Sequence, residues 1–329
     1  MKKLLAALLA GAMCVSLCAC GGTSDETTEP AEDTAAATYT VGICQLVEHV
    51  ALDAATQGFQ DALVDTLGEG AVSFDLQNAQ NDSNTCSTIV NGFVSSGVDL
   101  ILANATPALQ AAAAGTADIP ILGTSVTEYG VALELDDFSG TVGGNISGTS
   151  DLAPLDEQAA MLQEWFPDAQ NVGLLYCSAE ANSQYQVDVV KAELEALGYT
   201  CELYAFSDSN DLSAVCSSAA AACDVIYVPT DNTVAANTGI IDNICRPAKV
   251  PVIAGEEGIC SGCGVATLSI SYYDLGYTTG EMAAAILTGE ADISTMAIEY
   301  TTVTKKYNQA IVDELGLTVP EGYAAIEIG

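Results

Sequence analysis

The feature that most constrains the fold is a regular alternation of apolar segments with amphipathic segments, which begins at Tyr39 and runs through most of the chain. In a first series, strand-like segments at 39–46, 72–77, 100–103 and 121–123 are separated by helical patterns. Parallel strands need helical connections, and strands covered on both faces are nearly continuous apolar runs. The alternation therefore predicts an α/β fold with doubly wound parallel sheets.

A second series of the same kind starts with a helix at 155–165 and ends with a strand at 251–254. The 329 residues of the chain are enough for two domains of ordinary size. The elements that follow the second series are left over, and we expect them to complete the first. We therefore predict a first lobe formed by 39–147 plus 272–329 and a second lobe formed by 148–271.

The N-terminus has the pattern of an export signal, with two lysines and an apolar run that ends in Leu-Cys-Ala-Cys20. The run is too short for an ordinary membrane span, and its end resembles the bacterial lipobox. That resemblance implies a signal peptide at 1–19 and a lipidated Cys20, with acyl chains such as palmitate. An ordinary signal peptide with an incidental cysteine is the alternative. The polar stretch at 20–38 is expected to be a flexible tether, which places the body at the extracytoplasmic face of the cell membrane.

The charge of the chain excludes two classes of partner. There are 44 acidic residues against 7 basic ones, and the formal net charge is −37. Nucleic acids need Lys and Arg opposite their phosphates, and anionic lipid surfaces repel such a protein. We therefore expect no nucleic-acid partner, and we expect the lipid anchor alone to provide membrane attachment.

The cysteines do not form an obvious disulfide framework, because nine of the 12 follow Cys20 and nine is an odd number. Several lie in apolar runs, where a free thiol packs as a small hydrophobic group. Cys260 and Cys263 have the C-x-x-C spacing of a redox pair or of half a metal site. There is no second C-x-x-C, and His49, the single histidine, is far away in sequence. We expect mostly reduced thiols, no metal and no cofactor.

Polar side chains follow the ends of the predicted strands, which is where ligands gather in open parallel sheets. These side chains are Gln45, Glu48, His49, Thr106, Ser125, Thr127, Asn182, Asp231, Asn232 and Glu256. Capping of the helices that follow is an equally valid interpretation for any one of them. Taken together, they suggest that hydroxyls of the first lobe bind a carboxylate and that Asp231 or Glu256 binds an ammonium group. That combination describes an α-amino acid.

Seven stretches, taken in order along the chain, resemble the ABC-transporter substrate-binding proteins of the tryptophan/tyrosine type. These stretches are 41–49, 106–108, 144–151, 180–183, 229–232, 255–257 and 271–276. The resemblance implies a type 1 periplasmic binding protein fold with three segments that cross between the lobes. It also implies an aromatic amino acid as ligand, and delivery to an ABC permease with its ATPase. The contacts it implies are Thr106, Ser125, Thr127, Asp151, Asn182, Asp231 and Glu256. Val50 replaces the usual proline of the first loop.

The two alternative functions are enzymatic catalysis and the sensing of a solute. Catalysis is not expected, because the chain has no G-x-S-x-G, P-loop or H-E-x-x-H motif and no nucleophile paired with a base. A lipoprotein sensor for a small solute, such as a sugar or nucleoside, would need the same closing cleft. Tyr129, Tyr176, Tyr185 and Tyr272 are candidates for stacking on a ligand, whereas Trp165 is expected to pack in the core. A monomer suits a closing receptor.

Overall fold

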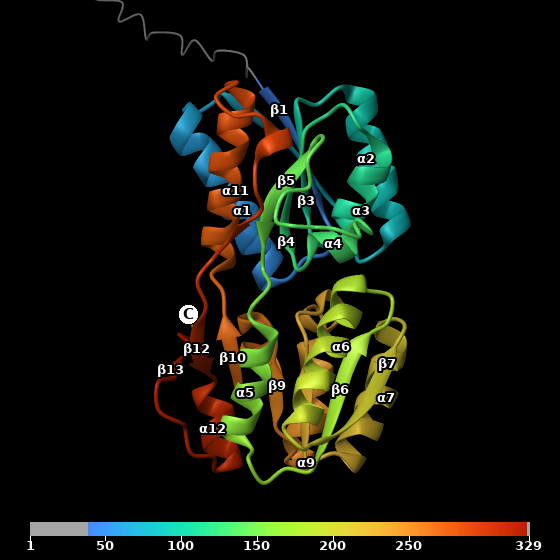
Figure 1. The fold of residues 1–329 in the computed structure, drawn as a ribbon, viewed down its shortest axis with the longest axis vertical. Coiled ribbons are helices and arrows are strands. Elements are labelled where there is room, and N and C mark those ends of the chain that lie inside the picture. Colours follow the sequence, from blue (N-terminus) through green and yellow to red (C-terminus); the bar gives the residue numbers. More distant parts are fainter. Residues whose placement is uncertain (1–38, 328–329) are drawn as a thin grey trace, which may run out of the picture. The chain divides into compact units, whose positions relative to one another are not determined.

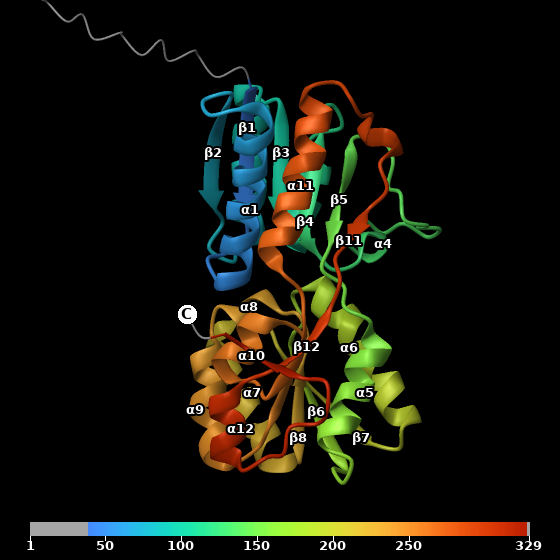
Figure 2. The ribbon, with the colours of Figure 1, turned by 90° about the vertical axis from the view of Figure 1, so that its left-hand side faces the viewer.

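The computed structural model describes residues 39–327, and these form two sheets, each with helices on both faces (Figures 1 and 2). The predicted signal peptide at 1–19, the lipidation site Cys20 and the tether at 20–38 lie outside the described residues. All neighbouring strands pair in parallel except for one antiparallel pair near the C-terminus. The structure therefore confirms the predicted class, an α/β fold with two doubly wound sheets.

The first sheet has the strand order β11-β5-β4-β3-β1-β2. Its strands are β1 (Tyr39–Gln45), β2 (Val72–Asn78), β3 (Leu100–Asn104), β4 (Ile121–Val126), β5 (Ile146–Ser150) and β11 (Glu299–Tyr300). Its helices are α1 (Val50–Leu67), α2 (Ser83–Ser96), α3 (Thr106–Gly115), α4 (Tyr129–Ala132), α11 (Tyr272–Leu287) and the 3₁₀ turn η1 (Ile293–Thr295). Helices α2 and α3 cover one face of the sheet, and α1 and α11 cover the other (Figure 1).

Helices α1 and α11 lie side by side, although more than 200 residues separate them in sequence (Figures 1 and 2). Glycines make this approach possible. A Cβ atom at Gly276 would lie 1.9 Å from the carbonyl oxygen of Ala55, and one at Gly58 would lie 2.1 Å from that of Tyr273. Close backbone contact therefore joins α11 to the first lobe.

The second sheet has the strand order β13-β12-β10-β9-β8-β6-β7. Its strands are β6 (Asn171–Cys177), β7 (Thr200–Phe206), β8 (Val225–Val228), β9 (Val252–Ala254), β10 (Ala266–Ser269), β12 (Thr304–Tyr307) and β13 (Ala324–Ala325). Its helices are α5 (Leu155–Trp165), α6 (Ala181–Ala196), α7 (Ser209–Ala222), α8 (Asn232–Ala235), α9 (Thr238–Ala248), α10 (Glu257–Cys263) and α12 (Gln309–Leu315). One apolar core lies under α5 and α6, and another lies under α7, α9 and α10.

Two of the predicted lobe boundaries are wrong. Strand β5 continues the first sheet to Ser150, so residues 148–150 belong there and not to the second lobe. Residues 304–325, predicted in the first lobe, carry β12 and β13 of the second sheet. Strand β12 pairs antiparallel with β10, from Ser269 opposite Thr304 to Ala266 opposite Tyr307. Without β12, the backbone of β10 would be an unpaired sheet edge.

The chain passes between the two sheets three times. The first crossing follows β5 at 151–154, the second joins β10 to α11 at 270–271, and the third joins β11 to β12 at 301–303. Within residues 39–327, no helix combines the length and the apolar character that a membrane crossing requires.

Candidate functional site

Strand ends of both sheets contribute to one small cavity of about 10 Å³, which has room for at most a single water molecule. Its lining consists of His49, Leu52, Ser125, Thr127, Asp151, Asn182, Thr230, Asp231, Asn232, Ala235, Glu256 and Tyr272. Of the ten strand-end residues predicted from the sequence, together with Asp151, eight are in this lining, and Gln45, Glu48 and Thr106 are not. The structure thus brings together residues from six separate strand ends, those of β1, β4, β5, β6, β8 and β9.

Three polar atoms of this lining are buried and have no hydrogen-bond partner: Ser125 Oγ, Asp151 Oδ1 and Asn182 Oδ1. Across residues 39–327, eight buried side-chain atoms share this condition, so more than a third of them meet at one small cavity. Buried polar atoms in folded proteins are nearly always paired, because leaving one unpaired costs about 1–3 kcal/mol. A polar ligand at this point would supply the missing partners.

An irregularity at the end of β4 directs Ser125 toward the cavity. The pairing of β4 with β5 shifts register between Gly123 and Val126, as in a β-bulge. Ser125 itself has φ 54°, in the left-handed region that non-glycine residues rarely adopt. Bulges and strained backbone of this kind occur next to functional sites, where they redirect a side chain.

Asp151 is the buried carboxyl group with a free oxygen. It begins the first crossing segment, and its Oδ2 accepts a hydrogen bond from the Tyr272 hydroxyl at 2.9 Å, while Oδ1 remains unpaired. Burial raises the pKa of Asp151, and hydrogen bonds from Tyr272 and Thr127 lower it in part. A cation bound at Oδ1 would compensate the buried negative charge.

Asn182, near the start of α6, presents its carbonyl oxygen because its amide nitrogen is already used. Nδ2 donates to the Thr230 carbonyl at 3.0 Å and to Glu180 Oε2 at 3.3 Å. Glu180 is buried and also accepts hydrogen bonds from the backbone and side chain of both Asn232 and Thr233, at 2.8–3.1 Å. Glu180 therefore holds the start of α8 against α6.

Asp231 and Glu256 cap helices in the structure. Both oxygens of Asp231 accept backbone N–H groups, from Cys177 at 2.7 Å and from Val234 at 2.9 Å. Glu256 accepts from the N–H groups of Gly258 and Ile259 at the start of α10. Burial, together with nearby Glu180, raises the pKa of Asp231 to about 8, and burial raises that of Glu256 to about 7. The capping interpretation, left open by the sequence, therefore holds for both.

Two side-chain hydrogen bonds join the lobes beside the cavity. His49 Nε2 lies 3.3 Å from Asn232 Oδ1, and Asn81 Nδ2 donates to Thr233 Oγ1 at 3.0 Å. Burial lowers the pKa of His49, which favours the neutral ring. Both partners in the second lobe are the residues that Glu180 holds, so one buried carboxylate supports both contacts.

Gln45 and Thr106 lie elsewhere. The amide of Gln45 is used within the first lobe, where Nε2 donates to Asp53 Oδ1 at 2.6 Å and Oε1 accepts from Thr56 at 2.6 Å. Thr106 is buried in the first turn of α3, and the residue at the N-cap position is Ala105, with φ 93°. Local sequence does not distinguish these two from the eight in the lining, because all ten follow strands.

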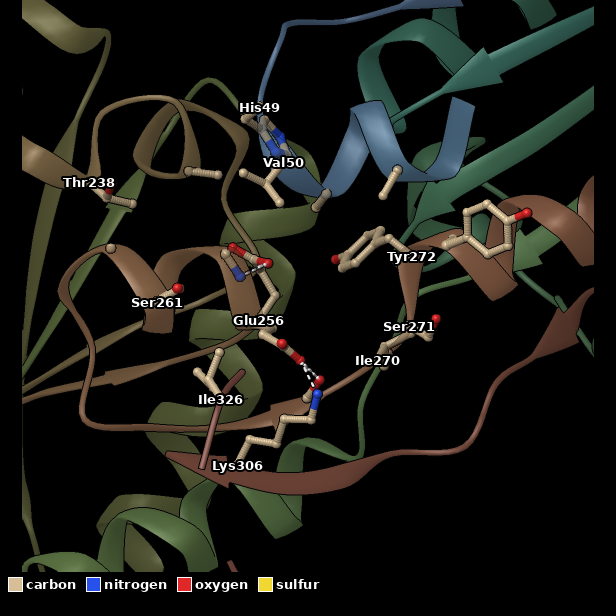
Figure 3. Close-up of a pocket in the computed structure, with 18 of the residues that line it drawn as sticks. His49, Val50, Thr238, Glu256, Ser261, Ile270, Ser271, Tyr272, Lys306 and Ile326 are labelled. Atoms are coloured by element: carbon tan, nitrogen blue, oxygen red, sulfur yellow. Dashed lines mark hydrogen bonds and ion pairs between the residues drawn. The ribbon is translucent and has the colours of Figure 1, made fainter. Parts of the chain in front are cut away.

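A second, larger cavity of about 900 Å³ adjoins the small one (Figure 3). The two share His49, Ala235, Glu256 and Tyr272. Figure 3 shows the Tyr272 ring projecting toward Glu256 across this space. On its far side Lys306 Nζ pairs with Glu257 Oε2 at 2.7 Å. Of the four tyrosines that are candidates for stacking on a ligand, Tyr272 lines both cavities.

The remaining aromatic candidates lie outside both cavities. Tyr129 is buried under β4 and β5 and donates to the Thr149 carbonyl at 3.1 Å, while Tyr176 and Tyr185 belong to the core under α6. Trp165 packs edge-on against Tyr323 at a centroid distance of 5.3 Å, as expected of a core residue. Within residues 39–327, no cluster of His, Cys, Asp and Glu has the arrangement of a metal site.

Comparison with known proteins agrees with this arrangement. The family model described as ABC transporter substrate binding protein matches residues 40–326. A protein of Clostridioides difficile (strain R20291), named tyrosine-binding protein, is 36% identical over 312 residues, which is 92% of this chain and 89% of that protein. Distant solute-binding proteins, one of them a complex with L-rhamnose at 12% identity and a TM-score of 0.59, share the fold and confirm the predicted type 1 architecture.

Two solved structures are more similar. An ABC domain from Streptococcus pneumonia, in complex with L-Trp, has a TM-score of 0.83 at 30% identity and covers 89% of this chain and 100% of its own. The ligand-free, open structure of a substrate binding protein with adhesive properties, from Clostridium difficile, has a TM-score of 0.66 at 38% identity, with coverage of 88% and 100%. The better fit to the complex agrees with the narrow cavity and with the hydrogen bonds that join the lobes.

Proposed function

We propose that this chain, which belongs to the ABC transporter substrate-binding protein family, captures a free aromatic amino acid between its lobes. Tryptophan and tyrosine are the proposed ligands. The proposal is supported by the relative named tyrosine-binding protein and by the neighbour that was solved with L-Trp. The ligand is passed on unchanged to an ABC permease and its ATPase.

The observation that carries the proposal is the group of three unpaired atoms at the small cavity. Asp151 Oδ1 and Asn182 Oδ1 are acceptors, and together they suit the donors of an ammonium group. Ser125 Oγ can donate to a carboxylate. This assignment replaces Asp231 and Glu256 as the ammonium partners, because their oxygens already serve as helix caps.

The ligand side chain is proposed to extend from the small cavity toward the larger one. Tyr272 and His49 line both cavities and offer ring faces to an aromatic group. The volume of about 10 Å³ around the unpaired atoms is too small for an amino acid, so binding requires a small separation of the lobes. The two inter-lobe hydrogen bonds, His49 with Asn232 and Asn81 with Thr233, oppose that movement.

The cellular setting is also part of the proposal. Cleavage at 1–19, lipidation of Cys20 and a tether at 20–38 would hold a monomeric receptor at the extracytoplasmic face of the membrane. The test is metabolic labelling with a palmitate analogue. Labelling is expected in the natural chain and not in Cys20→Ser, and labelling that persists in the variant would disprove the anchor.

Ligand identity can be tested by calorimetry and thermal shift with a matched set of compounds. L-Trp and L-Tyr should bind, whereas tryptamine, which lacks the carboxylate, and indole-3-propionate, which lacks the ammonium, should bind much more weakly. At 100 times Kd, a ligand raises the free energy of unfolding by about 2.7 kcal/mol. Stabilisation by a sugar or a nucleoside alone would refute the proposal.

A further inference from the structure

We propose that Cys216 and Cys245 form a disulfide that braces the second lobe once the protein has been exported. The two sulfur atoms lie 3.6 Å apart in the structure. Cys216 is on α7 and Cys245 is on the neighbouring helix α9, and both are in the apolar core under these helices. The proposal does not depend on the ligand; it rests on the extracytoplasmic location proposed above.

The geometry needs little adjustment. A disulfide bond is about 2.05 Å long, so the two sulfurs must approach by about 1.6 Å in total. The bond would close a loop between positions 29 apart in sequence. That loop contains β8, α8 and the cavity residues Asp231 and Asn232.

The C-x-x-C pair singled out by the sequence is a weaker candidate. Cys260 and Cys263 lie one turn apart on α10, and the Cys263 thiol donates to the Ile259 carbonyl of its own helix at 3.4 Å. Cys223, near the end of α7, contacts the Tyr204 hydroxyl at 3.6 Å. The thiols of Cys44 and Cys86 in the first lobe also interact. Cys216 and Cys245 have a direct contact between their sulfur atoms at 3.6 Å, and we therefore assign the disulfide to them.

The reaction is thiol–disulfide exchange with a disulfide-class oxidant, such as oxidised glutathione or an oxidoreductase. One thiolate attacks the oxidant and forms a mixed disulfide, releasing one reduced thiol. The second protein thiolate then attacks the mixed disulfide and releases the remaining half of the oxidant as a second reduced thiol. In total, two protein S–H bonds are lost, one protein S–S bond forms, and two electrons pass to the oxidant. The side chains are 0% and 2% exposed, so exchange occurs during folding or after local opening of α7 from α9.

The linkage can be mapped on the purified full-length chain after refolding with oxidised and reduced glutathione. Free thiols are alkylated under denaturing conditions, and the chain is cut with trypsin and Asp-N. Cys216 then lies in peptide 211–223, and Cys245 in 242–249, where Pro247 protects the Arg246 bond. We expect these peptides to be linked, with Cys223 alkylated. Alkylation of both Cys216 and Cys245 would overturn the proposal.

Substitutions provide a second measurement. The oxidised chain should melt on the order of 5 °C above its reduced form, and Cys216→Ser or Cys245→Ser should abolish that difference. Cys223→Ser is the matched control, because Cys223 lies in the same peptide as Cys216. This variant should keep both the linked peptides and the difference in melting temperature between its oxidised and reduced forms. If a variant fails to fold, the peptide map of the natural chain still decides. Loss of the linked peptides in Cys223→Ser would contradict the assignment. Amino-acid binding by the reduced chain tests the proposed function separately.

Discussion

The Tyr272 hydroxyl donates to Oδ2 of Asp151 at 2.9 Å, which leaves Oδ1 of the same carboxyl buried and unpaired. Asp151 starts the first crossing segment, and Tyr272 follows the second, so this bond joins two of the three connections between the lobes. One oxygen thus fixes the orientation of the side chain, and the other is available to a ligand.

Asp151→Asn should weaken amino-acid binding, because it keeps the shape of the side chain and removes the charge that pairs with the ammonium group. Truncating one partner of a buried charge pair costs about 2–5 kcal/mol, which corresponds to at least a 30-fold increase in Kd. Calorimetry measures the change. Asp156→Asn on the exposed side of α5 is the matched control and should bind normally. Equal affinity of the two variants would place the ammonium group elsewhere.

Affinity should fall as the pH is lowered from about 8 to about 5.5. Burial raises the pKa of Asp151, and that of Glu256 to about 7, in the protein without ligand. A bound ammonium group favours the ionised carboxylate and lowers these pKa values, so binding releases protons and acid opposes it. Titration calorimetry at several pH values checks the slope. In Asp151→Asn the slope should be smaller, and affinity that rises in acid would contradict the argument.

Asn81→Ala should open the lobes more easily, because it removes the hydrogen bond to Thr233. A neutral hydrogen bond contributes about 0.5–1.5 kcal/mol, so ligand release should be up to about tenfold faster. Stopped-flow fluorescence measures the rate, and X-ray scattering measures the spread of the lobes. Asn91→Ala, on the exposed face of α2, is the control. An unchanged release rate in Asn81→Ala would show that this bond does not limit opening.

Gly276→Ala should destabilise the first lobe, because its Cβ would lie 1.9 Å from the Ala55 carbonyl oxygen. Overpacking of this kind costs about 1–3 kcal/mol. Gly92→Ala on α2 meets no atom within 4 Å and should stabilise the protein by about 0.5–1 kcal/mol. Urea unfolding compares the two variants. A stable Gly276→Ala protein would mean that α1 and α11 can separate without loss.

Tertiary contacts, and not local pattern, decided which strand-end side chains meet at the cavity. Glu180 illustrates this, because its role comes from donors on Asn232 and Thr233, more than 50 positions away. Asp231, Glu256 and Asp151 all carry a carboxyl group, so side-chain chemistry does not distinguish them. Asp231 and Glu256 become helix caps because backbone N–H groups lie beside them, whereas Asp151 keeps one unpaired oxygen. Cys216 and Cys245 are likewise adjacent only in the folded chain.

The sequence alone determined the class of fold, because helix and strand periodicities are local properties and two such series were visible from Tyr39 onward. It also placed most polar residues at the correct sheet edge, since the carboxyl ends of parallel strands share one side. The sequence did not predict that residues 304–325 belong to the second lobe, because strands of two to four residues have too few positions to show a period. The sheet that such short strands join is decided by which sheet edge lacks a partner. The arrangement of donors and acceptors at the cavity depends on distances between separate segments, which only the folded chain sets.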